Sequence, residues 1–266
     1  YCYCTKSSHF SFVLEEALKN DIHIETSSAF DIPIIESLFE SGKLTKDAYV
    51  ICNGFKRPQY IENICNLIEE GFENVIPILD NKFELDEYDR NITRKIKIGI
   101  RIASEEEPKF DFYTSRLGIR YNDIVSYYEE EIKNNPKFEL KMLHFFINTG
   151  IRDSAYYWNE LSKCVQVYCD LKAVCPQLTS LNIGGGFPIK NSLNFDFDYA
   201  YMAEEIIAQI KGICQRSNTP EPNIFTEFGS FTVGESGAVL YSIIDQKRQN
   251  DRELWNMIDS SFITTL

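Results

Sequence analysis

The sequence lacks a long apolar run and an N-terminal targeting segment. No stretch of its 266 residues approaches the roughly 20 apolar residues that a helix needs to cross a bilayer. The first residues also lack the charged, apolar and small-residue regions of a secretory signal peptide. We therefore expect a cytoplasmic protein without a membrane partner.

Basic residues are scarce relative to acidic ones. The chain has 27 lysines and arginines against 40 aspartates and glutamates, which gives a formal net charge of −13. Such a charge repels nucleic acid and anionic membranes, so we expect no nucleic-acid partner. It would attract a small cationic substrate, although an acidic surface can also serve solubility alone.

Disulfide and metal-binding patterns are also missing. The eight cysteines have no compact framework spacing, and a chain of this length needs no disulfide bonds to build a core. Cys2 and Cys4 are one residue apart but have no matching pair of cysteine or histidine ligands. We therefore predict reduced thiols and no zinc site.

Strand-like and helix-like segments alternate regularly along the chain, which predicts an α/β protein with a parallel sheet. The expected strands are 1–5, 22–26, 48–52, 75–79, 96–103, 140–147, 180–183 and 223–227. The expected helices are 11–19, 32–40, 58–70, 124–134, 153–172 and 198–214. The chain has 266 residues, close to the roughly 250 typical of a (β/α)8 barrel. Eight such units therefore favour that fold, and an open doubly wound sheet is the alternative.

A glycine-rich turn follows the seventh expected strand. Residues 182–188 read Asn-Ile-Gly-Gly-Gly-Phe-Pro, and Gly184, Gly185 and Gly186 have no side chains to keep a phosphate away from their N–H groups. Barrels of this kind hold phosphate on the loops after strands seven and eight. The turn therefore predicts a phosphate site, although taken alone it could be an ordinary tight turn.

Two charged residues lie at the ends of the neighbouring strands. Glu227 ends the eighth expected strand, where its anion would stabilise a protonated ring nitrogen of a cofactor. Lys6 follows the first strand, where a neutral amine could attack a carbonyl. Each alone could be a solvated surface charge, so the interpretation depends on the two occurring together with the glycine turn.

With these features the sequence resembles the alanine-racemase-like (fold type III) barrel decarboxylases of basic amino acids, which use pyridoxal phosphate. Residues 3–6, Tyr-Cys-Thr-Lys, resemble the strand that ends in the lysine forming the Schiff base with the cofactor. The glycine turn resembles the phosphate loop, and residues 227–229, Glu-Phe-Gly, resemble the Glu-Pro-Gly turn that faces the pyridine nitrogen.

The resemblance implies a site, a domain division and an assembly. The implied catalytic residue is Lys6, and the implied cofactor-binding residues are Lys6, Glu25, Arg101, Phe146, Thr149, Gly184, Gly185, Gly186, Glu227, Gly229 and Ser230. A TIM barrel of alanine-racemase type would occupy residues 1–235. Residues 236–266 would begin the connection into a C-terminal β domain missing from this chain, and the protein would form a homodimer or a higher homo-oligomer.

The implied reaction is pyridoxal-phosphate-dependent decarboxylation of a basic amino acid. Residues 50–56, 143–146, 150–153 and 257–262 resemble members that convert L-arginine to agmatine and CO2 in polyamine biosynthesis. Alternatives are action on ornithine, diaminopimelate or carboxynorspermidine, a racemase, or a non-catalytic regulator. Magnesium stays open as a second cofactor, and the family's general acid, a cysteine of the C-terminal domain, would lie beyond residue 266.

Two residues depart from the family pattern. Phe146 stands where the family has a histidine stacked on the cofactor ring, and Ser230 stands where it has an arginine near the phosphate. A phenylalanine can still stack but supplies no charge. Phosphate would then rely on glycine N–H groups and the hydroxyls of Thr149 and Ser230. We interpret His144, two residues before Phe146 on the same strand face, as a hydrogen-bonded interior residue.

Overall fold

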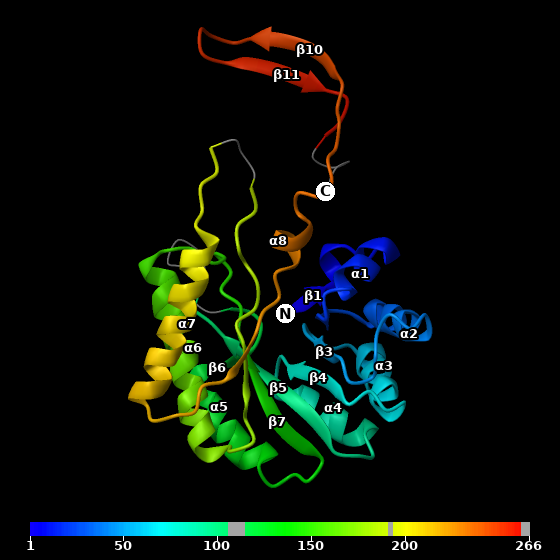
Figure 1. The fold of residues 1–266 in the computed structure, drawn as a ribbon, viewed down its shortest axis with the longest axis vertical. Coiled ribbons are helices and arrows are strands. Elements are labelled where there is room, and N and C mark those ends of the chain that lie inside the picture. The colour runs from blue at the N-terminus through cyan, green and yellow to red at the C-terminus, as the bar shows by residue number, and fades with distance from the viewer. Residues whose placement is uncertain (106–114, 191–193, 262–266) are drawn as a thin grey trace.

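A parallel sheet forms the centre of the fold (Figure 1). The computed structural model describes residues 1–105, 115–190 and 194–261. The strands that follow one another around the sheet are β1 (Cys2–Cys4), β2 (His23–Thr26), β3 (Tyr49–Cys52), β4 (Asn74–Leu79), β5 (Ile96–Ala103), β7 (Phe138–His144), β8 (Ser180–Asn182) and β9 (Asn223–Phe225). Each strand pairs in parallel with the next.

The two ends of this sheet meet. The N–H of Cys2 in β1 donates to the carbonyl of Thr226, directly after β9, over 2.8 Å. The sheet is therefore a nearly closed barrel, as the eight expected strands predicted, and the open doubly wound alternative is wrong.

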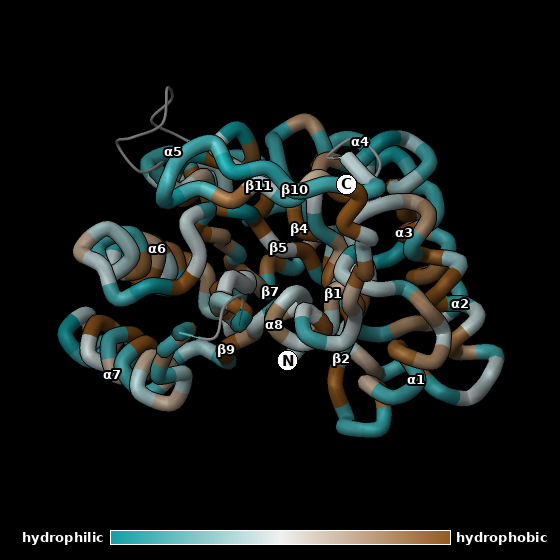
Figure 2. The backbone as a smooth tube through the Cα atoms, turned by 90° about the horizontal axis from the view of Figure 1, so that it is seen from above, coloured by the Kyte–Doolittle hydropathy of each residue, from teal (hydrophilic) through white to brown (hydrophobic). Residues whose placement is uncertain are grey.

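The helices cover the outside of the barrel, as Figure 2 shows from above. The six expected helices are present, with bounds shifted by up to three residues at their starts, and α4 is additional. They are α1 (Ser11–Leu18), α2 (Ile32–Glu40), α3 (Pro58–Glu69), α4 (Phe83–Asn91), α5 (Tyr121–Tyr127), α6 (Ala155–Val174) and α7 (Tyr199–Arg216). Short helical turns are η1 (Thr5–Ser7), η2 (Ala29–Asp31), η3 (Tyr128–Ile132), which continues α5 as a π-helix, and α8 (Gly229–Val233). In the described residues, no helix is both long and apolar enough to cross a membrane.

The sequence pattern missed several short elements. Helix α4 is rich in charged residues, and among its side chains Leu85 and Tyr88 supply the buried apolar surface, which is too little for a periodic signal. Strand β6 (Ile119–Arg120) has two residues and pairs with the end of β5. The hairpin of β10 (Ile243–Arg248) and β11 (Leu254–Ile258) stands apart from the barrel in Figure 1. Part of the expected loop 104–115, and residues 262–266, lie outside the described residues.

Strand alternation divides the barrel interior into two layers. Cys2, Ile51, Ile76, Met142 and Phe225 pack into an apolar cluster, with Ile78 among them. Two residues further along several of these strands, the inner face becomes polar, because side chains at positions i and i+2 share a face. The polar layer contains Asn53, His144 and Glu227, all buried. The carboxyl ends of the strands thus carry the polar side chains, which is where barrels of this kind place their chemistry.

A buried ion pair fixes the loop that follows β3. Lys56 and Glu84 are almost fully buried, and the Lys56 Nζ lies 3.3 Å from the Glu84 carboxylate. Glu84 also accepts from the backbone N–H of Lys56 (3.0 Å) and of Asp80 (3.1 Å). Burial lowers the pKa of Lys56, and Glu84 opposes that effect. The pair therefore joins the β3 loop to the end of β4 and the start of α4.

We expect Lys56→Met to destabilise the protein by about 3–5 kcal/mol, because it leaves the Glu84 carboxylate buried without its cation. Urea unfolding followed by circular dichroism measures the change. Lys133→Met, which removes the exposed Lys133–Glu129 pair, is the control and should cost less than about 1 kcal/mol. Equal effects of the two substitutions would contradict a special role for the buried pair.

Candidate active site

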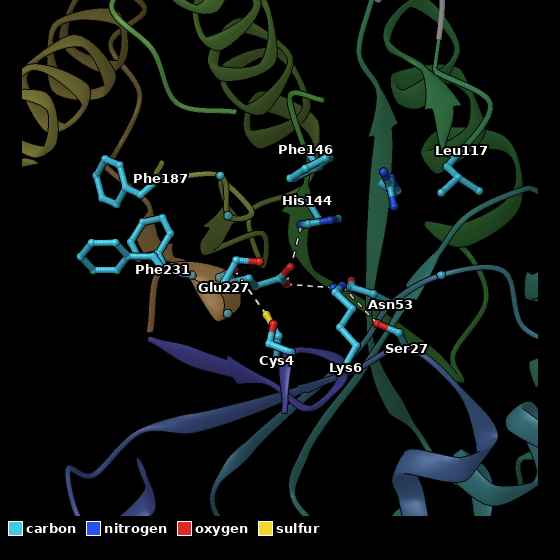
Figure 3. A pocket seen from close by; sticks show the side chains of 18 residues that line it. Cys4, Lys6, Ser27, Asn53, Leu117, His144, Phe146, Phe187, Glu227 and Phe231 are labelled. Carbon is cyan, nitrogen blue, oxygen red and sulfur yellow. Dashed lines mark hydrogen bonds and ion pairs between the residues drawn. The ribbon is translucent and has the colours of Figure 1, made fainter. Parts of the chain in front are cut away.

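A cavity of about 480 Å³ opens at the carboxyl ends of the barrel strands (Figure 3). It is lined by Cys4, Lys6, Ser7, Ser27, Asn53, Gly54, Arg101, Leu117, His144, Phe146, Gly185, Gly186, Phe187, Glu227, Phe228, Gly229, Ser230 and Phe231. Its volume lies within the roughly 300–1,000 Å³ of small-molecule and cofactor sites. The lining contains charged, amide and aromatic groups contributed from most of the barrel strands.

Lys6 extends into this cavity from η1, directly after β1. Its Nζ lies 3.4 Å from the Glu25 Oε2 and 3.3 Å from the Ser27 Oγ. Burial would lower the pKa of Lys6, but the Glu25 and Glu227 carboxylates outweigh it, so that its pKa is raised. The amine is therefore held as an ammonium ion against these two carboxylates.

Glu227 lies inside the barrel and receives two amide hydrogen bonds. Its Oε1 accepts from the Asn53 Nδ2 over 2.9 Å and from the Asn182 Nδ2 over 2.5 Å. Burial raises its pKa, whereas the two amides, Lys6 and Arg101 oppose that effect. Because both amides only donate to this oxygen, they stabilise the charged form of the carboxylate.

His144 and Phe146 come from β7 and the residues after it, and Figure 3 shows them side by side over the cavity. Burial and the charge of Arg101 lower the pKa of His144 to about 3, so its imidazole is neutral at physiological pH. Its contact with Glu227, 4.0 Å from Nδ1 to Oε1, is therefore not an ion pair. The interior position expected for His144 is confirmed, but Nδ1 has no hydrogen-bond partner in the described structure.

The glycine turn approaches other backbone segments too closely for side chains. A Cβ at Gly185 would lie 2.2 Å from the Glu227 carbonyl oxygen, and Gly184 and Gly186 have positive φ angles of 69° and 117°. The Gly184 N–H donates to the Asn182 Oδ1 over 2.9 Å. No hydrogen bond within the described residues uses the N–H of Gly185 or Gly186. Two donors beside the cavity are thus available to an anion.

The predicted site residues fall into two groups. Eight line the cavity, namely Lys6, Arg101, Phe146, Gly185, Gly186, Glu227, Gly229 and Ser230. The other three do not line it. Glu25 is fully buried and contacts Lys6, Gly184 is bonded to Asn182, and Thr149 precedes the segment that packs against Gly186. The Thr149 Oγ1 is buried without a hydrogen-bond partner in the described residues.

The sequence did not indicate that Asn53 belongs to the site or that Asn182 donates a hydrogen bond to Glu227. It also did not indicate the group of aromatic rings beside the glycine turn. Asn53 directly follows an expected strand, so its position was available as a signal. The rings of Phe187, Phe228 and Phe231 line the cavity and contact one another, with centroids 4.6 Å apart for Phe187 and Phe228. Nothing local in the sequence indicates that these rings meet.

The residues present suit the expected cofactor, pyridoxal phosphate. Lys6 and Glu227 face the same cavity. Beside it, the N–H groups of Gly185 and Gly186 have no hydrogen-bond partner among the described residues. A Cβ on any of the three turn glycines would come within 3 Å of neighbouring backbone atoms. In the described parts of the chain, no group of three or more His, Cys, Asp or Glu residues is arranged to hold a metal ion.

Comparison with known proteins agrees with this geometry. Residues 2–234 match the family described as "Pyridoxal-dependent decarboxylase, pyridoxal binding domain". The chain is 26% identical over 236 residues to the biosynthetic arginine decarboxylase of Prochlorococcus marinus strain MIT 9215, covering 83% of this chain. It is 24% identical over 262 residues to arginine decarboxylase 2 of Arabidopsis thaliana, covering 91% of this chain. The match spans 36% of the length of each relative.

Solved structures share the fold. The biosynthetic arginine decarboxylase of Campylobacter jejuni superposes with a TM-score of 0.69 at 21% identity, covering 87% of this chain and 39% of that one. Diaminopimelate decarboxylase of Helicobacter pylori, complexed with L-lysine, superposes with a TM-score of 0.77 at 17% identity, covering 97% and 63%. The chain belongs to the pyridoxal-dependent decarboxylase family, and residues 2–234 correspond to its pyridoxal-binding domain.

Proposed function

We propose that this chain is the cofactor-binding part of an enzyme that decarboxylates L-arginine to agmatine and CO2, using pyridoxal phosphate. The observation that carries the proposal is the convergence of Lys6, Glu227 and the free glycine N–H groups on one cavity. The choice of arginine is supported by curated relatives named arginine decarboxylases. Ornithine and diaminopimelate are the substrates to compare in the same assay.

Each group would have a distinct task. When bound, the cofactor supplies an electron-accepting ring that stabilises the carbanion left by departing CO2. Lys6 would attach the cofactor aldehyde and yield it to the substrate amine. Glu227, anchored by Asn53 and Asn182, would hold a proton at the ring nitrogen. Phe146 would cover one face of the ring and exclude water from it.

The phosphate would lie at the glycine turn. Gly185 and Gly186 would donate their N–H groups, and Ser230, which lines the same cavity near Gly229, would donate its hydroxyl. Gly184 would act by shaping the turn, because its own N–H is already bonded to Asn182. Thr149 would contribute only if its hydroxyl turned from its buried position toward the cavity.

The cysteines of this chain are poor candidates for the acid that protonates the α-carbon. All eight are buried. Cys4 reaches the cavity, but its Sγ donates to the Glu227 carbonyl over 3.3 Å, and burial raises the pKa of its thiol well above the ordinary value. We therefore assign this role to none of the eight cysteines.

Further features of the proposal concern the whole protein. We propose a barrel over residues 1–235, with residues 236–266 leading toward a C-terminal β domain. The assembly we propose is a homodimer or a higher homo-oligomer.

The β10–β11 hairpin exposes apolar side chains, such as those of Ile244 and Trp255, and their exposure supports the proposal that a further domain buries them. A cytoplasmic location and a magnesium requirement stay predictions, the second to be tested by assay with and without a chelator.

Lys6→Ala in the intact protein should abolish covalent attachment of pyridoxal phosphate and reduce CO2 release from arginine by at least about 10²-fold. Borohydride reduction followed by peptide mass spectrometry locates the pyridoxyl group, which we expect on Lys6 in the wild type. Lys43→Ala, which changes an exposed lysine, is the control. A pyridoxyl group on another lysine, or full CO2 release by Lys6→Ala, would refute the assignment.

Glu227→Gln should retain cofactor binding but lower kcat by about 10²–10³-fold, because a neutral amide cannot stabilise the charged ring. In the wild type, activity should fall as the pH drops through the pKa of Glu227. Burial raises that pKa above its usual value in the cofactor-free protein, but the positive charge of the bound ring would lower it, so the loss should begin at a lower pH than the titration of Glu227 without cofactor. Initial rates against pH measure both effects, with the exposed Glu235→Gln as control. An unchanged kcat would argue against the role of Glu227.

A further inference from the structure

Two buried carboxylates meet at Asn53, a residue that lines the cavity. Glu25, in β2, is fully buried, and Glu227, after β9, is 8% exposed. Asn53, the residue after β3, lies between them and is 4% exposed. Its Nδ2 donates to the Glu25 Oε1 over 3.0 Å and to the Glu227 Oε1 over 2.9 Å. One side-chain amide thus bonds both acids, and Figure 3 shows it beside Glu227 and Lys6.

A side-chain amide can bond two neighbouring carboxylates without exchanging a proton with them, which a titrating group could not do. Burial raises the pKa of Glu25, and the nearby Glu227 raises it further, so the two anions repel each other. An amide nitrogen carries two hydrogens, one for each carboxylate, and it cannot lose a proton to either. Exchanging the Asn53 oxygen and nitrogen would direct an acceptor toward both carboxylates, so the bonding pattern itself determines the amide orientation.

Three other donors among the described residues, Ser27, Lys6 and Asn182, each bond one of the two acids. Ser27 donates to the Glu25 Oε1 over 2.6 Å, and Lys6 lies 3.4 Å from the Glu25 Oε2. Asn182 serves Glu227 alone. Lys6 is also the group that would react with the cofactor, so its ammonium charge is not a permanent partner of Glu25. Asn53, in contrast, donates to both carboxylates at once.

The position of Asn53 is itself well fixed. Its backbone N–H donates to the Thr26 carbonyl over 2.8 Å, which extends the pairing of β2 and β3 beyond the last ladder residues. Gly54 follows with a φ of 75°, and the buried Lys56–Glu84 pair holds the next turn. The Asn53 Oδ1 is buried and has no hydrogen-bond partner among the residues described.

We propose that Asn53 is a positioning residue that fixes the carboxylates of Glu25 and Glu227 with the two hydrogens of its single amide. It keeps Glu227 ionised and aimed into the cavity, and it limits the repulsion between the two acids. Its consequence for catalysis rests on the proposed function, in which Glu227 faces the ring nitrogen of the cofactor.

Carboxylate titration in the cofactor-free intact protein tests the positioning role directly. With ¹³C-labelled glutamate side chains, assigned by Glu25→Gln and Glu227→Gln, Asn53→Ala should shift the titration of the buried pair upward by about one pH unit or more. Because the two sites are coupled, the pair is scored together. Asn53→Ser, which keeps one donor, should give a smaller shift, and it carries the test if the alanine variant does not fold.

Asn135→Ala is the matched control, because Asn135 also donates to a carboxylate, that of Asp89, but lies outside the cavity lining. It should leave the titration of Glu25 and Glu227 at its wild-type position. A wild-type titration in both Asn53 variants would overturn the positioning role, whatever their activity.

A second measurement separates this inference from the proposed function. With ¹⁵N-labelled pyridoxal phosphate bound, the ring nitrogen should remain protonated to a higher pH in the wild type and Asn135→Ala than in the Asn53 variants, by about one pH unit. If the wild type takes up no pyridoxal phosphate, the proposed function fails, but the glutamate titration still decides the role of Asn53. An unchanged ring-nitrogen titration in Asn53→Ala would overturn its consequence for the cofactor.

Discussion

Two carboxylates buried inside a nearly closed barrel set the demands that the rest of the site must meet. Removing Glu25 and Glu227 from water favours their neutral forms, and each disfavours the charge of the other. Amide donors, a hydroxyl and a lysine ammonium oppose these effects. These donors come from the ends of different strands, so the charge state of the site depends on the whole barrel being assembled.

Barrel closure is what brings the first and last strands into one site. The Cys2 N–H bonds the Thr226 carbonyl, and two residues further along the Cys4 Sγ donates to the Glu227 carbonyl. Lys6 and Glu227 therefore face the same cavity although they lie near opposite ends of the barrel sequence. Lys6 and Glu227 each lie two residues beyond the last residue of their strand, β1 and β9, at the carboxyl ends where the cavity opens.

The glycine turn meets a different demand, the close approach of backbone to backbone. Gly185 packs against the Glu227 carbonyl, and Gly150 and Gly186 pack against each other. Because these glycines have no side chains, the turn can lie directly against the backbone of Glu227, just after β9. The same closeness leaves two N–H groups beside the cavity, with a wall of phenylalanine rings next to them.

Local pattern in the sequence determined the eight strands, six of the helices, the glycine turn and the residues Lys6 and Glu227, because hydrophobic period and strand position are properties of neighbouring residues. It did not indicate α4, whose apolar signal is weak, or β6 and the β10–β11 hairpin. It also missed Asn53, which bonds a glutamate 174 positions away. Only the tertiary structure decided that contact, because closure of the barrel brings residues distant in sequence within hydrogen-bonding distance.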